Sequence, residues 1–258
     1  MMTRYEVWLD KKSLSAIDPA IYILDISYGA THFLTTTHDK PGRNGQRVTG
    51  RQAQNTSVTV AIEIRERDIA RRQDICRRVH EWAILGGMLT TNDRRGQRLA
   101  VICDNPPSIG SALKWTQTLK MTFTAYEQPF WEDEYPRAVT IAGKDAEKSL
   151  YVGGFGVLAR VEAEVKNTSS KTVDALTLKA GGTTFEFAKL GLTAGGTLEI
   201  GYDKNDLLYI QTGDESKMHC RTAASDDELM VCTGTAEKMG VHADNEVSVT
   251  FKARRLYL

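Results

Sequence analysis

Residues 57–87, SVTVAIEIRERDIARRQDICRRVHEWAILGG, contain the two patterns that decide the fold. In the first eight residues, apolar side chains occupy every second position: Val58, Val60, Ile62 and Ile64. This spacing is the period of a strand with one buried face. From residue 68 onward the apolar spacing becomes helical. The stretch therefore predicts a strand followed directly by a helix.

The predicted helix begins at Asp68, which suits an N-cap, and ends at Gly86 and Gly87. One face is apolar: Ile75, Cys76, Val79, Trp82 and Ala83. The other face carries Arg71, Arg72, Arg77 and Arg78, with Asp74 and Glu81 spaced to pair with Arg78 and Arg77. These acidic residues neutralise part of the arginine charge, and the sequence contains no known nucleic-acid-binding motif. The face is therefore expected to be solvated or to contact another subunit, and not to bind nucleic acid.

A long polar segment precedes this strand. Residues 35–55 are rich in Thr, Gly, Arg and Asn, and the segment is longer than a plain connection needs. Within it, Asn44 and Gly45 favour a tight hairpin turn. The sequence therefore predicts a projecting loop or hairpin.

Further strands are predicted over residues 6–10, 21–27, 99–103 and 113–126. Residues 128–136 (QPFWEDEYP) then break the strand rhythm with two prolines and an acidic cluster around aromatic residues. We expect the chain to divide here into domains of residues 1–136 and 137–258. Phe130 and Trp131 are expected to pack back into the first domain.

The second half is predicted to consist of short strands without a helix. They fall at residues 157–165, 173–178, 184–187, 197–200, 207–211, 229–232 and 246–251. Turns of Gly, Asn and Asp separate them, which is typical of a β-sandwich. The predicted fold is thus mainly β: a β-sandwich-like N-terminal domain with one α-helix, followed by a C-terminal β-sandwich.

Composition is that of an average soluble globular protein, with 41% apolar and 26% charged residues among 258. The net charge is zero, yet residues 1–135 hold 13 Arg and 5 Lys, whereas residues 136–258 hold 5 Arg and 10 Lys. Because arginine suits interface ion pairs, the first half is expected to form the interfaces. The start of the chain lacks a signal-peptide pattern and no run is long enough for a membrane span, which predicts a protein made in a cytoplasm.

The sequence contains no recognised catalytic or metal-binding motif. Gly154 and Gly156 resemble a dinucleotide loop, but a strand pattern follows where a helix is required. The five histidines and four cysteines show no metal-ligand spacing, and the cysteines are expected to be reduced. The acidic run at residues 226–228 leaves a glycosidase carboxylate pair open as a distant possibility. No catalytic, cofactor or metal residue is predicted.

Taken in order, these features resemble the distal tail protein family of long-tailed phages and their prophage relatives. In the first half the resemblance rests on the strand at residues 57–64, the helix with a tryptophan near its end, and the strand closing at residues 128–131 (QPFW). In the second half it rests on residues 165–168 (VKNT), 192–200 (LTAGGTLEI) and the closing segment 246–257. The usual glycine and asparagine before the last strand stand here as Gly240 and Asn245, with a shifted spacing.

The resemblance implies a virion structural protein, a baseplate hub that joins the tail tube to the host-recognition tip. It implies a hexameric ring built by the first domain, galectin-like second domains radiating outward, and a central channel that DNA crosses without sequence-specific binding. The implied partners are the tail tube, tape measure, tip and tail-associated proteins, and a receptor-binding protein. The protein would be made in the bacterial host cytoplasm and sit at the distal end of the tail.

The interface residues expected from this implied ring are Arg43, Arg47 and Arg51 of the hairpin, which would pair with a neighbour's carboxylates, and Arg71 and Arg72 of the helix. In the second domain, Tyr202 and Tyr209 are predicted platforms for docking a protein or a sugar. A carbohydrate-binding adhesin module is the alternative function, and a glycan-degrading enzyme is a distant third.

Overall fold

The computed structural model describes residues 5–39, 46–107, 116–126, 128–203 and 207–258. The described chain is mainly β, with one α-helix, which confirms the predicted fold class. It divides into two compact units: Met1–Glu132 with Leu258, called unit 1, and Asp133–Tyr257, called unit 2. The sequence placed the boundary at residue 136.

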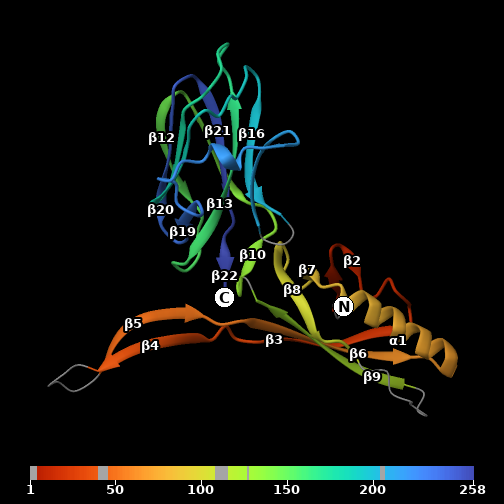
Figure 1. Ribbon diagram of the computed structural model, residues 1–258. Helices are drawn as coiled ribbons and strands as arrows, with labels where there is room; N and C mark the ends of the chain where they lie inside the picture. The colour runs from red at the N-terminus through yellow and green to blue at the C-terminus, as the bar shows by residue number, and fades with distance from the viewer. Residues whose placement is uncertain (1–4, 40–45, 108–115, 127, 204–206) are drawn as a thin grey trace. The chain divides into compact units, whose positions relative to one another are not determined.

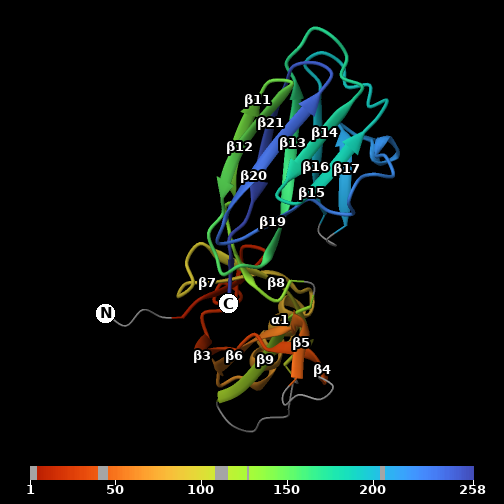
Figure 2. The same cartoon turned by 90° about the vertical axis from the view of Figure 1, so that its left-hand side faces the viewer.

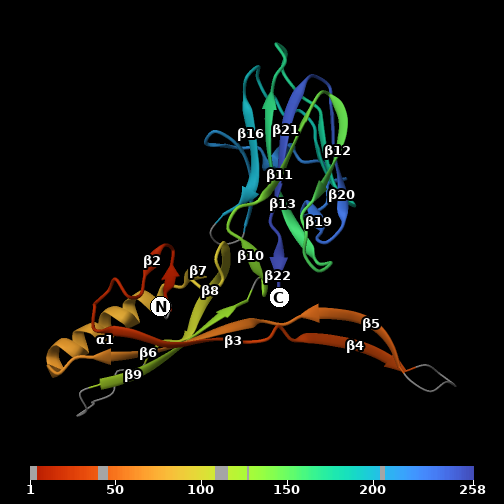
Figure 3. The ribbon, with the colours of Figure 1, turned by 180° about the vertical axis from the view of Figure 1, so that it is seen from behind.

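Unit 1 is one antiparallel sheet with a helix on one face and a hairpin extending from it (Figures 1 and 3). The sheet order is β2-β1-β7-β8-β9-β6-β3, and β10 pairs with β8. The strands are β1 (Val7–Leu9), β2 (Lys12–Ser13), β3 (Ile21–Tyr28), β6 (Thr56–Arg65), β7 (Gly87–Thr91), β8 (Gln97–Asn105), β9 (Thr116–Ala125) and β10 (Trp131–Asp133). The helix is α1 (Ile69–Ile84), and the hairpin is β4 (Phe33–Asp39) with β5 (Gln46–Ala53).

The core of unit 1 follows directly from residues 57–87. The predicted alternating side chains of β6 (Val58, Val60, Ile62 and Ile64) and the predicted stripe of α1 are all buried. Trp82 on the helix meets Phe123 of β9 edge to face, with ring centroids 6.0 Å apart. Burying each such large apolar side chain contributes about 1.5–3 kcal/mol. One face of the sheet is thereby fixed as the inner face.

Both predicted ends of the helix are confirmed. Asp68 is the N-cap, and its Oδ1 accepts a hydrogen bond from the Arg71 N–H at 2.8 Å. At the other end Gly86 has a φ of 61°, in the left-handed region that favours glycine. The chain then enters β7, a strand that the sequence missed, where Asp10 Oδ1 accepts from the Met88 N–H. Because β7 is only five residues long, pairing with β1 and β8 defines it more than its own pattern does.

Trp131 belongs to the core of unit 1, as expected. Its side chain is only 2% exposed. The indole meets Tyr28 edge to face at 5.7 Å, and the Arg94 guanidinium lies 4.9 Å from the indole centroid. Residues 128–136, which break the strand pattern, therefore contain a core residue of unit 1, Trp131, and then the boundary between the two units at residues 132–133.

Unit 2 is a sandwich of two antiparallel sheets, seen edge-on in Figure 1 and overlapping in Figure 2. One sheet has the order β11-β21-β13-β16-β17-β18, with β19 on β13; the other has the order β12-β20-β14-β15. The bounds are β11 (Arg137–Ala142), β12 (Asp145–Tyr151), β13 (Leu158–Asn167), β14 (Leu176–Ala180), β15 (Thr183–Phe187), β16 (Thr197–Tyr202), β17 (Leu208–Thr212), β18 (Glu215–Ser216), β19 (Met230–Cys232), β20 (Ala236–Ala243), β21 (Val247–Ala253) and β22 (Leu256–Tyr257). A short 3-10 turn, η1, covers Met218–Cys220.

All seven strands predicted for the second half are present, with shifted ends, but β11, β12, β18, β20 and β22 were missed. β12 presents mostly exposed polar side chains, so it carries little alternation. β20 contains Gly240, a residue that weakens a strand taken by itself. β12 exists because it pairs with β20, which also pairs with β14, and β11 exists because it pairs with β21. That pairing is invisible to a local pattern.

Asn167 explains one motif that carried the resemblance. The side chain is 1% exposed, and its Nδ2 donates to the carbonyl oxygens of Lys171 and Leu192, both at 2.8 Å. Its Oδ1 accepts from the Ser169 N–H and hydroxyl. A single buried amide thus holds the turn after β13 against the segment that leads to β16.

Replacing Asn167 with Asp keeps the shape of the side chain but removes its two N–H donors. The carbonyl oxygens of Lys171 and Leu192 then lose these hydrogen bonds. We expect unit 2 to lose about 2–4 kcal/mol of unfolding free energy, measured by denaturation followed with circular dichroism. Asn245→Asp, which loses one exposed hydrogen bond to Thr172, is the matched control. All four tryptophans lie in unit 1, so tryptophan fluorescence follows the unfolding of unit 1 alone. That unfolding should be the same in Asn167→Asp as in the wild-type protein. Equal losses in the two variants would contradict this role for Asn167.

Candidate functional site

The hairpin that carries the predicted interface arginines is a separate two-stranded sheet of β4 and β5. Figure 1 shows it projecting from the sheet of unit 1, as the sequence predicted. Arg47 is exposed and lies opposite His38 in the register, and the Arg51 backbone lies opposite Thr35. Arg43 lies outside the described residues.

The hairpin also exposes apolar side chains. Leu34 is 55% exposed and Val48 is 59% exposed. An isolated two-stranded hairpin is only marginally stable in water, because it has no second layer to bury such groups. Burial of these side chains by a partner would therefore stabilise the hairpin.

The helix arginines are arranged differently from the prediction. Arg71 is exposed, but it pairs with Glu66 at 3.2 Å and with Asp18 at 3.7 Å. Arg72 was placed on the exposed face, and this placement was wrong. It is 2% exposed, and its Nη1 donates to the Glu66 carbonyl oxygen at 2.7 Å. The long arginine side chain folds back toward the start of the helix instead of into solvent.

Arg77 and Arg78 confirm the predicted pairing. Arg77 bridges Asp74 and Glu81 along the helix, and Arg78 pairs with Asp74. Arg78 also donates to the Ile17 carbonyl oxygen and to Asp18 Oδ2 at 3.0 Å. Asp18, with its side chain 8% exposed, thus anchors the helix to the chain ahead of β3. Much of the positive charge of this face is used inside unit 1.

Asp18 makes this anchor dependent on pH. Burial by itself raises the pKa of Asp18, but hydrogen bonds from the Ala20 N–H and Arg78, together with the positive charges of Arg71 and Arg78, hold it below its usual value. A carboxyl with a lowered pKa contributes stability above its unfolded pKa, about 3.9, and that stability is lost as pH falls through the folded pKa.

We therefore expect Asp18→Asn to lower the unfolding free energy of unit 1 by an amount that is constant between about pH 5 and 7 and shrinks below about pH 4. Urea denaturation followed by tryptophan fluorescence at several pH values measures this difference. Asp227→Asn, in a turn of unit 2, should leave the same curve unchanged at every pH. A difference for Asp18→Asn that does not vary with pH would show that the carboxylate charge is not what anchors the helix.

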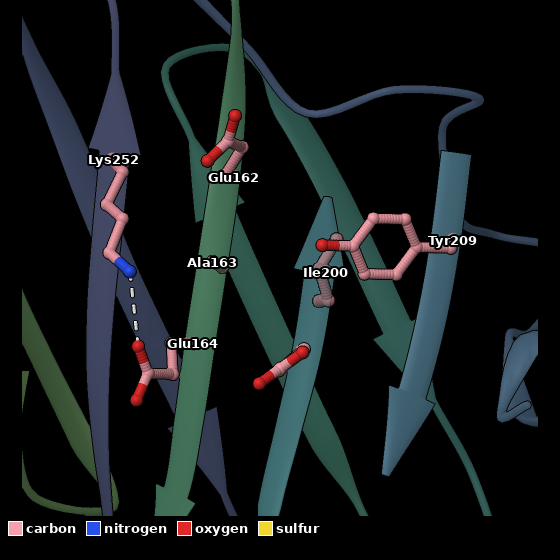
Figure 4. A pocket seen from close by; sticks show the side chains of 7 residues that line it. Glu162, Ala163, Glu164, Ile200, Tyr209 and Lys252 are labelled. Atoms are coloured by element: carbon pink, nitrogen blue, oxygen red, sulfur yellow. Dashed lines mark hydrogen bonds and ion pairs between the residues drawn. The ribbon is translucent and has the colours of Figure 1, made fainter. Parts of the chain in front are cut away.

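The two predicted tyrosine platforms differ. The Tyr202 ring is covered on one side by the Arg160 guanidinium, 4.7 Å from the ring centroid, and Arg160 pairs with Glu228 at 3.0 Å. Tyr202 therefore takes part in a stack within unit 2. Tyr209 instead lines an open hollow of about 210 Å³, together with Glu162, Ala163, Glu164, Glu199, Ile200 and Lys252 (Figure 4).

This hollow lies on the outer face of the larger sheet of unit 2. In β13 the side chains of Val161, Ala163 and Val165 point into the sandwich, so those of Glu162 and Glu164 point outward. Figure 4 shows the Tyr209 ring reaching from β17 across β16, and Lys252 reaching from β21 toward Glu164. Lys252 Nζ lies 3.1 Å from Glu164 Oε2.

Gly201 gives the ring its place. Tyr209 lies directly opposite Gly201 in the register, and a Cβ at Gly201 would come within 2.6 Å of the Tyr209 hydroxyl oxygen. The missing side chain lets the ring lie flat across β16. Burial raises the pKa of Tyr209, and the negative charges of Glu199 and Glu162 raise it further. The phenol is therefore neutral around pH 7.

Sequence reasoning found Tyr209 but missed the carboxylates, Lys252 and Gly201. The outward position of Glu162 and Glu164 was available from the alternation in residues 157–165. Their meeting with Glu199 and Lys252 depends on the pairing of β13 with β16 and β21. In the described part of the chain, no helix is long and apolar enough to cross a membrane, and no cluster of His, Cys, Asp and Glu is arranged to hold a metal ion.

No protein-family model matches the chain, and neither does any curated protein sequence. Solved structures do match over nearly all of it. The crystal structure of SPP1 Dit (gp 19.1), described as a paradigm of the hub adsorption apparatus in phages infecting Gram-positive bacteria, has a TM-score of 0.67 at 12% identity. It covers 98% of this chain and 99% of that one.

Two phage P2 baseplate structures in the activated conformation also match. The one with calcium has a TM-score of 0.58 at 10% identity and covers 99% of this chain and 98% of that one. The one with strontium has a TM-score of 0.55 at 10% identity, with coverages of 98% and 97%. The chain therefore has the fold of phage tail hub and baseplate proteins, which confirms at the level of fold the resemblance seen in the sequence.

Proposed function

We propose that this chain is a structural hub protein of a phage tail tip, which forms a hexameric ring between the tail tube and the host-recognition proteins. The observation that carries the proposal is the likeness to SPP1 Dit, which spans both units and nearly the whole length of each chain. A fold shared over one unit alone would allow many functions, since function resides in sites and not in folds. A likeness that includes both units in the same order supports a function found among proteins with this two-unit architecture.

The sheet of unit 1 is suited to a ring. β3 and β2 are the two end strands of the sheet. Inside the sheet, β8 pairs only with Thr122, Phe123 and Thr124 of β9, so within the described residues the edge of β9 that faces away from β6 is open over residues 116–121. Unpaired strand edges recruit other strands, and two different patches on each copy allow head-to-tail contacts that close into a ring. The projecting hairpin, with Leu34, Val48 and Arg47 exposed, supplies a further contact.

In this proposal unit 1 builds the ring around a channel for DNA, which it contacts without reading sequence. Unit 2 faces outward and docks further proteins. The partners are the tail tube, tape measure and tip proteins, together with a receptor-binding protein. The protein is made in the bacterial cytoplasm and resides at the distal end of the tail in the virion. Its role is assembly and not catalysis.

The second candidate is a carbohydrate-binding adhesin module. The observation in its favour is the Tyr209 ring beside three carboxylates, because an aromatic face and nearby polar groups are what sugar sites commonly use. A glycan array separates the two, since the hub proposal requires no sugar binding.

We expect the purified chain to form rings of six copies. Native mass spectrometry should give six times the 28.7 kDa chain mass, and negative-stain images should show a ring with a central opening. Monomers at micromolar concentration, with both units folded, would contradict the proposal.

Deleting residues 38–50 should yield monomers by light scattering, because it removes the hairpin contact. Tryptophan fluorescence of the deleted protein checks that unit 1 still folds. A single change, Arg47→Glu, should weaken the ring, and added salt should weaken the variant ring less than the wild-type ring, because salt screens the new repulsion. Lys238→Glu, a charge reversal at a side chain of unit 2 that is 79% exposed, is the control. Intact hexamers after the deletion would show that the ring does not depend on the hairpin.

A further inference from the structure

We propose that the hollow around Tyr209 is a docking site for one arginine or lysine side chain presented by another protein of the tail tip. The inference rests on the proposed function only in naming the source of that side chain. It concerns the outer face of the sheet formed by β21, β13, β16 and β17.

The first argument is the placement of charge. Glu164 lies directly opposite Glu199 in the register of β13 and β16, and Glu162 is two residues from Glu164 on the same face. Like charges directly opposite each other destabilise a sheet. Among the described residues that line the hollow, Lys252 is the only cation, and it is engaged with Glu164. In this lining three carboxylates therefore face one ammonium group.

The second argument is the aromatic ring. Tyr209 is held flat across Gly201, beside Glu199 and Glu162. A neutral phenol ring attracts a cation to its face, and a guanidinium group stacks there while its N–H groups donate to carboxylates. Ring and carboxylates together provide the two features that recognise an arginine side chain.

The size and donor balance of the hollow argue against a sugar. Its volume of about 210 Å³ is below the roughly 300 Å³ at which small-molecule sites begin. Sugar hydroxyls both donate and accept, whereas ionised carboxylates only accept; the Lys252 ammonium is already bound to Glu164, which leaves the Tyr209 hydroxyl as the remaining donor among the described side chains of the lining. A long cationic side chain requires acceptors alone.

The test uses the full chain labelled with 3-fluorotyrosine, with the Tyr209 resonance assigned through Tyr209→Phe. Arginine amide and lysine amide, each acetylated on the α-amino group so that only the side chain is charged, are the probes, and citrulline amide acetylated in the same way is the neutral isostere of arginine. Arginine amide should shift the Tyr209 resonance saturably, and citrulline amide should not. Glu162→Gln and Glu199→Gln should each weaken binding about threefold, as expected for a partly exposed ion pair. Glu147→Gln, an exposed glutamate of β12, should have no effect.

Lys252→Gln provides the decisive comparison, because removing the competing cation should tighten arginine amide binding about threefold, whereas the loss of a merely structural ion pair would weaken it. The proposal is overturned by no saturable shift, by an equal response to citrulline amide, by a saturable shift with galactose or glucose instead, or by weaker binding in Lys252→Gln. Ring formation is scored separately by native mass. If rings form but arginine amide does not bind, the docking site is contradicted and the hub function is not. If arginine amide binds but no rings form, the hub function is contradicted and the docking site is not.

Discussion

The packing of α1 on the inner face of β6 and β9 is the interaction on which unit 1 depends. The alternation of β6 and the stripe of α1 meet in a single core, with Trp82 against Phe123 at its centre. Once the helix covers that face, it stabilises the sheet without closing it. The packing leaves β3 as an end strand and, among the described residues, leaves part of β9 without a partner strand on one edge. In the proposed ring these edges are where other copies would bind.

The arginines show how charge is divided between folding and assembly. Arg78 and Arg72 are used within unit 1, one on Asp18 and the Ile17 carbonyl oxygen, the other on the Glu66 carbonyl oxygen. Arg47 on the hairpin remains exposed. Arginine enrichment alone would have assigned all of them to interfaces. The positions of the hydrogen-bond acceptors separate the arginines that hold the helix in place from the exposed Arg47, which the proposed ring uses.

In unit 2, one strand serves both the core and the surface. The alternation of β13 places Val161, Ala163 and Val165 in the sandwich and Glu162 and Glu164 on the outside. The cross-strand pair of Glu164 and Glu199 places two like charges opposite each other, and the Lys252 ammonium is paired with Glu164. Such an arrangement is expected where a surface is shaped for a partner and not for the stability of the domain.

The sequence by itself determined the elements whose patterns are local: the strand and helix of residues 57–87 with both helix ends, the hairpin, seven of the strands of the second half and the order of the two units. It did not find β2, β7, β10, β11, β12, β18, β20 or β22, because those strands are short, polar or interrupted by glycine and exist through their neighbours. It also misplaced Arg72, since a long flexible side chain follows available acceptors and not helical geometry alone. The hollow around Tyr209 was decided by tertiary structure, because Glu162, Glu199, Gly201 and Lys252 come together only when β13 pairs with β16 and β21, and β16 with β17.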